Sequence, residues 1–369
     1  PTGSIGPSGP SGPSGPWRGR DGRGGANHDR KLSDPSPTLT DVPQTTSPDR
    51  ATTSGLELQL EGHRRELIAY CYRMLGSSFE AEDAVQETFV RAWRSYDSFE
   101  GRSSVRSWLY RIATNVCLDM VGSAQRRARP MEMGPASVQP TAPGPALPEA
   151  TWIQPMPDSA VLADSGDPAE LAVQRETIRL AFIAALQHLP PRQRAVLILR
   201  DVLRWKAAEV AQLIGSTVAS VNSALQRARA TLAEIDPAAA PDKELDEQER
   251  ALVAKYIAAF ERYDMTSLAQ LLHDEVVLSM PPYALWIVGP QEVARWMLGP
   301  GMKCRGSRVV PTAANGSPAF GQYRCMDGRF EPWALVVLET DGTRITGINS
   351  FLDTQALFPQ FGLPMTLDG

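Results

Sequence analysis

Six polar residues near the start of one helical stretch of this 369-residue chain have the chemistry of a nucleic-acid reader. Ser, Thr and Asn side chains can reach base edges and phosphates without steric cost, and Arg can bind either phosphate or guanine. The residues concerned are Thr217, Ser220, Asn222, Ser223, Arg227 and Arg229. They predict a DNA-binding surface.

The elements that would position these residues are two helices joined by a short turn. A short helix is predicted from Trp205 to Ile214, then a turn with the sequence G-S-T, then a longer helix from Val218 to Leu232. In the longer helix the apolar residues predicted to share one face are Val218, Val221, Leu225, Ala228 and Leu232. A short helix, a glycine-containing turn and a second helix with small polar residues at its start are typical of a helix-turn-helix.

A second pair of helices is predicted around residues 77–121. Ser77 and Glu80 form a capping pattern before D-A-V-Q-E-T-F-V-R-A-W, in which Val85, Phe89 and Trp93 recur every fourth residue. The opposite, polar face carries Asp83, Gln86, Glu87 and Arg91. After a turn at residues 101–104, S-W-L-Y-R-I-A-T-N-V-C-L-D predicts a helix with four inward residues: Trp108, Ile112, Val116 and Met120. An amphipathic hairpin with a solvated polar face would show the same pattern.

Composition and charge divide the chain into parts. Residues 171–235 hold nine Lys and Arg against four Asp and Glu, whereas residues 236–369 hold eleven against seventeen. A basic middle and an acidic end indicate one part that binds nucleic acid and one that does not. The predicted segments are a disordered tail over 1–55, a helical domain over 56–129, a Pro-rich linker over 130–168, a helical domain over 169–235, a hinge over 236–248 and a last domain over 249–369.

The Pro-rich linker contains one apolar island, T-W-I-Q-P-M-P-D over residues 151–158. A plain flexible linker has little reason to carry Trp, Ile and Met together, and aromatics flanked by proline suit an extended segment docked on a surface. Trp152, Ile153 and Pro155 are the predicted contact residues. An apolar but idle linker is the alternative.

The last domain is predicted to be α+β, with helices over 252–263 and 265–272 before the strands. The predicted strands are 275–280, 308–313, 319–326, 330–340 and 344–352, with a helix over 291–298 after the first and hairpin signals at Asp327-Gly328 and Asp341-Gly342. A curved sheet of this kind could enclose an apolar pocket for a small hydrophobic ligand. Its candidate lining residues are Tyr283, Trp286, Trp296, Tyr323 and Trp333, with Met280 and Phe351, and each could equally be ordinary core.

The two helical domains resemble domains two and four of bacterial extracytoplasmic-function (ECF) sigma factors, and the linker island resembles a W-L-x-P-x-P motif of those with a SnoaL-like extension. The last domain resembles the SnoaL-like cone. The fold class implied is multidomain, with two all-α sigma domains followed by an α+β cone. The resemblance implies that Asp83, Gln86, Glu87 and Arg91 bind the β′ clamp helices of core RNA polymerase, and that domain four meets the β flap.

The same resemblance assigns the promoter contacts. It implies that the −10 element is read by residues of the second helix and its preceding loop: Arg102, Arg106, Trp108, Arg111, Asn115 and Asp119. The helix-turn-helix would read the −35 element. The chain would then be a sigma factor that directs promoter-specific initiation, with a regulatory C-terminal domain.

Two other functional classes remain open on the sequence. A ligand-responsive DNA-binding regulator would need only the helix-turn-helix, and it would have no use for the polar face at Asp83–Glu87. A SnoaL-like enzyme would need a carboxylate base and an oxyanion donor, for which only His273 and Asp353 are placed near the pocket. Because both are predicted at the ends of elements, the sequence does not predict an enzyme.

Cysteine and histidine are scattered, so the sequence predicts neither a metal site nor a cofactor. The four cysteines lie in apolar segments and are predicted to be buried and reduced. No apolar run is long enough to span a membrane, which together with the reduced cysteines favours a cytoplasmic protein.

Overall fold

The computed structural model describes residues 57–101, 103–121, 126–163, 165–235 and 247–368. The predicted tail over 1–55 and most of the predicted hinge over 236–248 lie outside the described residues. Within the described residues, no helix combines the length and the apolar character needed to cross a membrane.

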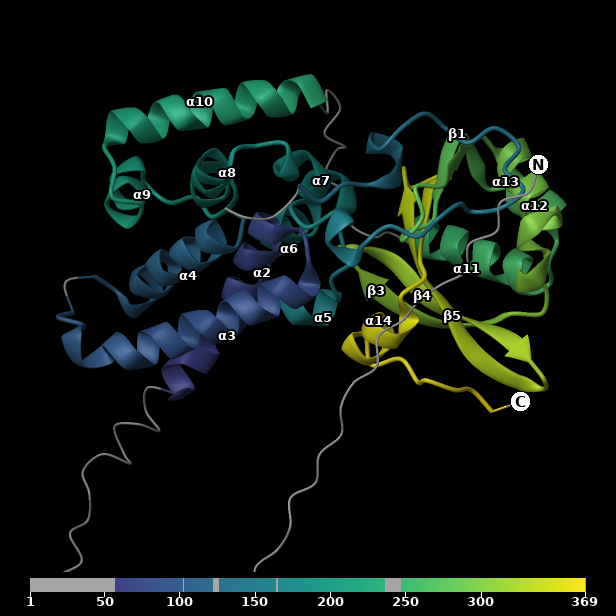
Figure 1. Ribbon diagram of the computed structural model, residues 1–369, viewed down its shortest axis with the longest axis horizontal. Coiled ribbons are helices and arrows are strands. Elements are labelled where there is room, and N and C mark those ends of the chain that lie inside the picture. Colours follow the sequence, from purple (N-terminus) through teal and green to yellow (C-terminus); the bar gives the residue numbers. More distant parts are fainter. Residues whose placement is uncertain (1–56, 102, 122–125, 164, 236–246, 369) are drawn as a thin grey trace, which may run out of the picture. The chain divides into compact units, whose positions relative to one another are not determined.

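The first helical part consists mainly of three helices, α2 (Arg64–Leu75), α3 (Ser78–Ser95) and α4 (Val105–Val121) (Figure 1). Residues 57–62 are also helical, and a break at His63 separates them from α2. Ser77 caps α3 as predicted, because its hydroxyl accepts the N–H of Glu80 at 3.2 Å. Gly76, with a φ of 72°, ends α2.

The second helical part contains the predicted helix-turn-helix. Its helices are α6 (Pro168–Glu176), α7 (Leu180–Gln187), α8 (Pro191–Leu197), α9 (Ala207–Leu213) and α10 (Val218–Ile235), and a π-helical turn over Ile198–Val202 extends α8. Gly215 adopts a φ of 64° in the turn between α9 and α10. Helix α10 packs on α8 and α9 through Val221, Leu225 and Ala228, which are buried as predicted. Val218, also predicted to be buried, is 44% exposed in the first turn of α10.

The C-terminal domain is the predicted α+β cone (Figure 1). Its helices are α11 (Glu247–Glu261), α12 (Met265–Gln270), α13 (Pro290–Leu298) and α14 (Thr354–Gln360). Its strands are β1 (Leu272–Ser279), β2 (Trp286–Val288), β3 (Arg308–Ala314), β4 (Ser317–Met326), β5 (Arg329–Thr340) and β6 (Ile345–Phe351), in the order β2-β1-β6-β5-β4-β3. Strands β1 and β6 are parallel and all other neighbours are antiparallel. The short β2 and α14 were not predicted.

Two tight turns join β3 to β4 and β4 to β5. Asp327 and Gly328 have φ of 51° and 82°, the left-handed pair that the predicted hairpin requires. Asn315 and Gly316, with φ of 57° and 67°, make a second turn of this kind. This second turn was not predicted, although Asn-Gly is a strong hairpin signal.

The sheet of the cone has an apolar core on each face. On one face, α11, α12 and α13 pack over residues such as Leu278, Phe320 and Val336. On the other face, Tyr323, Leu335 and other residues pack with α14 and join the core of the helical parts in one continuous cluster. The C-terminal domain is therefore docked on the helical parts through apolar contact.

Candidate functional sites

The polar face of α3 is exposed, but it is less polar than predicted. Asp83 and Gln86 are exposed, and Glu87 and Arg91 are half-buried. Trp93, predicted to face the core with Val85 and Phe89, is instead 43% exposed, and Val90 is 41% exposed. Because Asp83, Gln86, Val90 and Trp93 follow one another at three- and four-residue spacing, they form one stripe along α3. The helix turns Trp93 outward near its end, where little of the core remains to cover it.

Ion pairs join two of the predicted polymerase-binding residues to each other and one of them to α4. Arg91 donates to Glu87 at 2.7 Å and to Asp119 of α4 at 3.1 Å. All three side chains are more than a third exposed, so each pair contributes little to stability. The pairs do place Asp119, predicted to read DNA, beside the predicted polymerase face.

The predicted −10 residues of α4 divide between two faces of the helix. Trp108 stacks on Phe99 with ring centroids 4.7 Å apart, and Asn115 and Asp119 are exposed one and two turns beyond Arg111 on that side. Arg106 lies on the other side of α4. Arg102 lies outside the described residues.

Arg106 is held between the two helical parts. Its Nε donates to Glu66 of α2 at 2.7 Å, and its guanidinium carbon lies 5.1 Å from the ring centroid of Tyr110. It also lies 5.4 Å from the ring centroid of Trp205, which was predicted to begin the short helix but lies two residues before α9. A side chain predicted to read DNA is thus engaged in the contact between the helical parts.

Two buried arginines also cross this contact. Arg73 of α2 donates to the carbonyl and hydroxyl oxygens of Thr177 at 3.0 and 2.8 Å, and Arg194 of α8 donates to the carbonyl of Met74. Burial lowers the pKa of each guanidinium to about 10. Among the described residues, no carboxylate lies within ion-pair distance of either arginine. Only neutral oxygen atoms therefore accept hydrogen bonds from the two guanidinium groups. Burying a cation in this way is costly.

The predicted −35 residues are all exposed on α10. Thr217 accepts the N–H of Ser220 at 3.2 Å and so caps the helix. Ser220, Ser223 and Arg227 share the outward face of α10. Gln226, which was not among the predicted residues, is exposed between Ser223 and Arg227. The spacing of the buried residues would have placed Gln226 there, and Gln is suited to reading adenine.

Arg229 and Asn222 lie on the flank of α10 rather than on its outward face. The guanidinium of Arg229 makes two hydrogen bonds to Asp201, at 2.8 and 2.7 Å. This ion pair raises the pKa of Arg229 through the hydrogen bonds to Asp201. Arg229 therefore differs from Arg227, whose outward position leaves it directed at solvent.

The apolar island of the linker is buried. Trp152 and Ile153 are 3% and 2% exposed, and Pro155 is also buried. The backbone of the island pairs with the first helical part, since Ile153 donates to the carbonyl of Ala128 at 3.2 Å and Gln154 donates to that of Gly76 at 3.0 Å. The island therefore lies along the first helical part as an extended segment.

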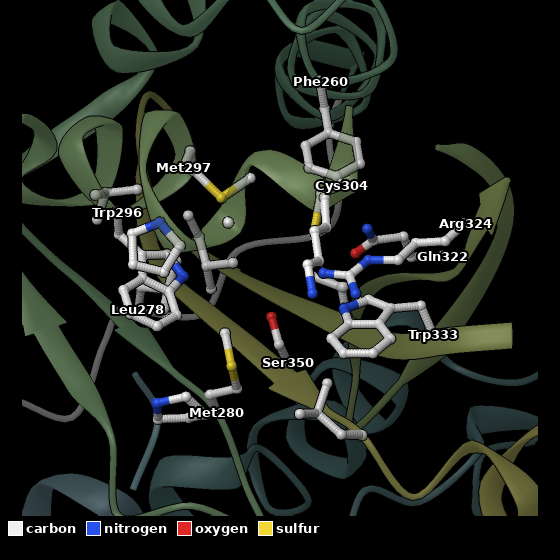
Figure 2. Close-up of a pocket in the computed structure, with 18 of the residues that line it drawn as sticks. Phe260, Leu278, Met280, Trp296, Met297, Cys304, Gln322, Arg324, Trp333 and Ser350 are labelled. Carbon is white, nitrogen blue, oxygen red and sulfur yellow. The ribbon is translucent and has the colours of Figure 1, made fainter. Parts of the chain in front are cut away.

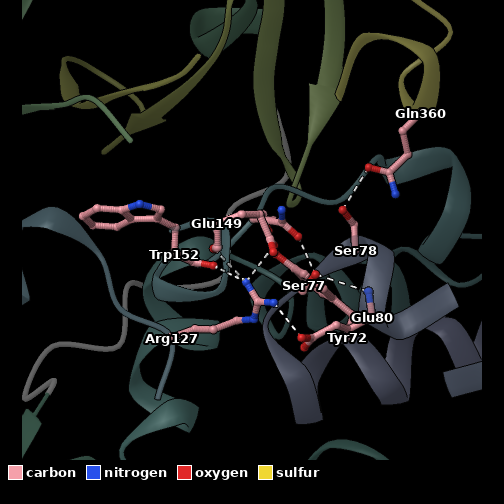
Figure 3. A network of polar contacts seen from close by, with 9 residues as sticks. Tyr72, Ser77, Ser78, Glu80, Arg127, Glu149, Trp152 and Gln360 are labelled. Carbon is pink, nitrogen blue, oxygen red and sulfur yellow. Dashed lines mark hydrogen bonds and ion pairs between the residues drawn. The ribbon is translucent and has the colours of Figure 1, made fainter. Parts of the chain in front are cut away.

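Arg127 fastens this segment (Figure 3). Its guanidinium donates to the carbonyl of Trp152 at 2.8 Å and forms ion pairs with Glu80 at 2.8 Å and Glu149 at 3.0 Å. The side chain is 4% exposed. In the sequence Arg127 is one of three arginines in a basic stretch, and only the tertiary structure distinguishes it from a solvated charge.

The β3–β4 turn of the cone enters the junction between the helical parts. We call the residues that meet here the interdomain joint: Tyr72, Met156, Asp158, Ile178, Asn315 and Gly316. The side-chain amide of Asn315 donates to the hydroxyl of Tyr72 and the carbonyl of Ile178, both at 2.6 Å, and its oxygen accepts the N–H of Met156 at 2.9 Å. One fully buried side chain thus connects the first helical part, the linker and the second helical part to the cone.

The neighbouring residue of the turn allows no side chain. A Cβ on Gly316 would lie 2.9 Å from the carbonyl oxygen of Arg175 in α6. The N–H of Gly316 donates to the carboxylate of Asp158 at 2.7 Å. Gly316 is needed both for its positive φ and for this close approach.

The carboxyl of Asp158 gives the joint a pH dependence. Burial raises its pKa to about 6, against the opposing effects of the Gly316 N–H and the charge of Arg175. Because an unfolded Asp titrates near 4, the folded state loses stability as the pH rises from about 4 to about 6. Asp158→Asn should match the parent in melting temperature near pH 4 and exceed it at pH 7, by the equivalent of up to about 3 kcal/mol. A difference in melting temperature that is constant over this range would contradict the prediction.

The cone holds a cavity of about 1140 Å³ between its helices and its sheet (Figure 2). Of the predicted lining residues, Tyr283, Trp296 and Trp333 line it, as does Met280. Tyr323 does not, because alternate residues of β4 face opposite sides of the sheet and Tyr323 packs edge-on against Phe358 of α14. Phe351 lines a separate cavity next to the linker island.

Trp286 faces the linker rather than the cavity, since its indole N–H donates to the carbonyl of Gly134 at 3.0 Å. The two titratable residues considered for an enzyme are also placed elsewhere. Asp353 precedes α14 beside the second cavity, and His273 accepts the backbone N–H of Glu275 at the start of β1. Cys325, predicted to be buried, is exposed, whereas the other three cysteines are buried and free.

Two family models match the chain. Sigma-70 region 2 matches residues 60–127, and Sigma-70, region 4 matches residues 179–232. The chain is 46% identical to the ECF RNA polymerase sigma factor SigG of Mycobacterium tuberculosis over 83% of each protein. It is 30% identical to the ECF RNA polymerase sigma factor SigW of Bacillus subtilis, over 46% of this chain and 82% of that protein.

A solved structure shares the fold. The crystal structure of the extracytoplasmic function sigma factor SigJ of Mycobacterium tuberculosis aligns with a TM-score of 0.54, at 21% identity, over 84% of this chain and 99% of that one. The alignment extends well beyond the two regions that the family models match, so the likeness includes parts of the chain outside the helical regions.

Proposed function

Because this chain belongs to the ECF sigma factors of RNA polymerase, we propose that its helical parts make the two sets of promoter contacts and that its SnoaL-like domain controls them. Promoter-specific initiation of transcription is the function of the family to which it belongs. This function places the protein in the cytoplasm, with core polymerase.

The polymerase contact is assigned to the exposed stripe of α3. Asp83, Gln86, Glu87 and Arg91 would meet the β′ clamp helices, and the exposed Val90 and Trp93 would add apolar contact. Large apolar side chains surrounded by polar ones are typical of protein interfaces. The second helical part would meet the β flap.

The promoter contacts are assigned to both helical parts. Trp108, Arg111, Asn115 and Asp119 offer one face of α4 to the −10 element, and Arg102 and Arg106 would join them. The −35 element would be read by the outward face of α10, where Ser220, Ser223 and Gln226 can reach bases and Arg227 can reach phosphate.

Arg227→Ala should weaken promoter binding by a similar factor for all −35 sequences, because a phosphate contact carries no sequence information. The slope of log K against log salt should fall by about 0.9. Arg229→Ala, the matched control, should change the slope less, since Asp201 already neutralises Arg229. Binding titrations of the holoenzyme at several salt concentrations measure both slopes. A change of sequence preference in Arg227→Ala at an unchanged slope would contradict the assignment.

In the arrangement that the structure describes, which we call closed, the two helical parts are too close together to bind both promoter elements. The −10 and −35 elements are about 25 base pairs apart, which is about 85 Å along B-DNA. Arg106 of α4 lies 5.4 Å from Trp205, and α10, which begins thirteen residues later, is only about 27 Å long. The two helical parts must therefore separate before both elements can be bound. The buried charges of Arg73 and Arg194 favour separation, because water would solvate them.

The SnoaL-like domain would hold this closed arrangement. Asn315 carries the proposal, since its single side chain bonds to both helical parts and to the linker at once. The apolar contact with the island adds to this, at about 1.5–3 kcal/mol for each large side chain buried. Loosening the joint would shift the population toward the open arrangement that binds promoter DNA.

The assignment is tested by transcription with core polymerase and sequencing of the transcripts that the purified chain initiates. Initiation at a common −35/−10 pattern supports it. DNA binding that is equally strong without polymerase would favour the alternative of a ligand-responsive DNA-binding regulator. Turnover of a hydrophobic ketone would favour the alternative of an enzyme fused to a DNA-binding part. Neither alternative explains the exposed stripe of α3.

A further inference from the structure

The cavity of the cone is large enough to hold a ligand instead of core side chains. Its volume of about 1140 Å³ is slightly above the range of about 300–1,000 Å³ that is usual for ligand pockets. Protein interiors are otherwise packed without voids of this size. Phe260, Leu278, Met280, Trp296 and Met297 form much of its wall, so the body of the ligand must be apolar (Figure 2).

One cation, Arg324 of β4, is built into this apolar wall. Its guanidinium carbon lies 3.2 Å from the ring centroid of Trp333, so the side chain is stacked flat on the indole. One terminal nitrogen contacts the sulfur of Cys304 at 3.2 Å, and the Nε is buried without a hydrogen-bond partner. Because sulfur is a weak acceptor, most of the five N–H groups of this guanidinium have no strong acceptor among the residues that the structure describes.

The charged residues that line the cavity also carry more positive than negative charge. Lys303 is a second cation in the lining, and Glu331 is the lone carboxylate among the lining residues that the structure describes. Glu331 is opposite Arg324 on β5, but it is exposed, and no ion pair joins the two. Stacking on Trp333 directs the guanidinium along the wall, which leaves its donors to a group inside the cavity.

We propose that the cavity binds an amphiphile with an apolar body and an acidic head group, and that Arg324 binds the head group. A carboxylate can accept two parallel N–H bonds from the planar guanidinium, which an alcohol or an amine does not match. An uncharged hydrophobe would leave the donors of Arg324 desolvated and unpaired, and a cationic one would be repelled.

The linker forms part of the rim of this cavity. Thr141, Ala142 and Pro143 line it, and hydrogen bonds tie the residues on either side to the cone. Ser137 donates to the carbonyl of Trp286 at 2.8 Å, and Leu147 donates to that of Pro282 at 2.9 Å. A ligand bound to Arg324 would therefore touch the chain that joins the two helical parts. Any effect on transcription rests on the proposed function, but binding itself does not.

Calorimetric titration of the full-length protein tests the inference, with decanoate as probe and decanol and decyltrimethylammonium as controls of equal chain length. Decanoate should bind at least tenfold more tightly than either control, since a charged hydrogen bond is involved. Arg324→Met should remove this preference while leaving decanol binding unchanged. Arg329→Met, at an exposed arginine that does not line the cavity, should bind all three probes as the parent does.

Three results would overturn the inference: no decanoate binding by the parent, equal affinity for decanoate and decanol, or an Arg324→Met protein that keeps the preference. Even if a variant does not fold, the affinities of the parent protein for the three probes test the inference. Hydrogen exchange over residues 134–147 should also change when decanoate binds. Because no polymerase is present, a failure here is distinct from a failure of the proposed regulation of transcription.

Discussion

Gly316→Ala should raise promoter-dependent transcription several-fold by loosening the interdomain joint. The new Cβ would lie 2.9 Å from the carbonyl oxygen of Arg175, so the β3–β4 turn must withdraw from α6. Withdrawal would weaken the bonds of Asn315 to Tyr72 and Ile178. The closed arrangement would become less populated, and more of the protein could bind core polymerase and both promoter elements.

Gly328→Ala is the matched control for this substitution. Gly328 has a φ of 82°, similar to the 67° of Gly316, so an alanine at either position is strained by about 1–2 kcal/mol. A Cβ at Gly328 would meet no atom within 4 Å. Multiple-round transcription with core polymerase compares the two variants with the parent, and melting temperatures record the shared strain. Equal activities in the two glycine variants would refute control through the joint.

Trp152→Ala should also raise transcription, by a smaller factor, because Trp152 belongs to the linker island and not to the cone. The indole is buried, and it lines the cavity that Phe351 and Leu357 of the cone also line. Its removal should destabilise the docked linker by about 3–5 kcal/mol. If Trp152→Ala and Gly316→Ala act on one equilibrium, combining them should raise transcription less than the product of the single effects.

Glu87→Lys should weaken binding to core polymerase by at least thirtyfold. Loss of a buried interfacial charge contact costs about 2–5 kcal/mol, and here a repelling charge also replaces it. Stability should change little, because the side chains of Glu87 and Arg91 are 44% and 41% exposed and Arg91 retains Asp119. Fluorescence anisotropy of labelled protein titrated with core polymerase gives the affinities.

Glu275→Lys makes the same charge change on an exposed residue of the cone and serves as the control. It should bind core polymerase as the parent does. Trp93→Ala should weaken binding without any change of charge, since exposed aromatic residues often dominate interface energies. If Glu87→Lys and Glu275→Lys bind equally well, the α3 stripe is not the polymerase contact.

The local elements could be predicted because their signals are local. The cap of α3 at Ser77, the turn at Gly215 and the hairpin at Asp327-Gly328 each depend on residues that are neighbours in the sequence. The periodic apolar residues of α10 identified its buried face in the same way. Strand β2 was missed because three residues are too few to show an alternating pattern.

The faces at which parts of the chain meet were decided only by the tertiary structure. The sequence predicts that Trp93 and Trp152 both pack against other residues, yet Trp93 is exposed at the end of α3 and Trp152 is buried. Arg127 and Arg106 look like solvated cations until their partners Glu80 and Trp205 are brought to them from elsewhere in the chain. Side chains alternate along β4, so Arg324 and Tyr323 face opposite sides of the sheet. Which of the two faces the cavity is decided only by the packing of the helices on the sheet.

The sequence by itself therefore determined the kind of protein, because a helix-turn-helix and the capped helices of the first part are specified by short-range patterns. The tertiary structure decided how the domains of that protein contact one another. In the sequence, Asn315 can be recognised only as a turn residue. The groups to which it hydrogen-bonds, at Tyr72, Met156 and Ile178, are more than a hundred residues away. Contacts at such separation depend on how whole domains pack, and no local propensity encodes them.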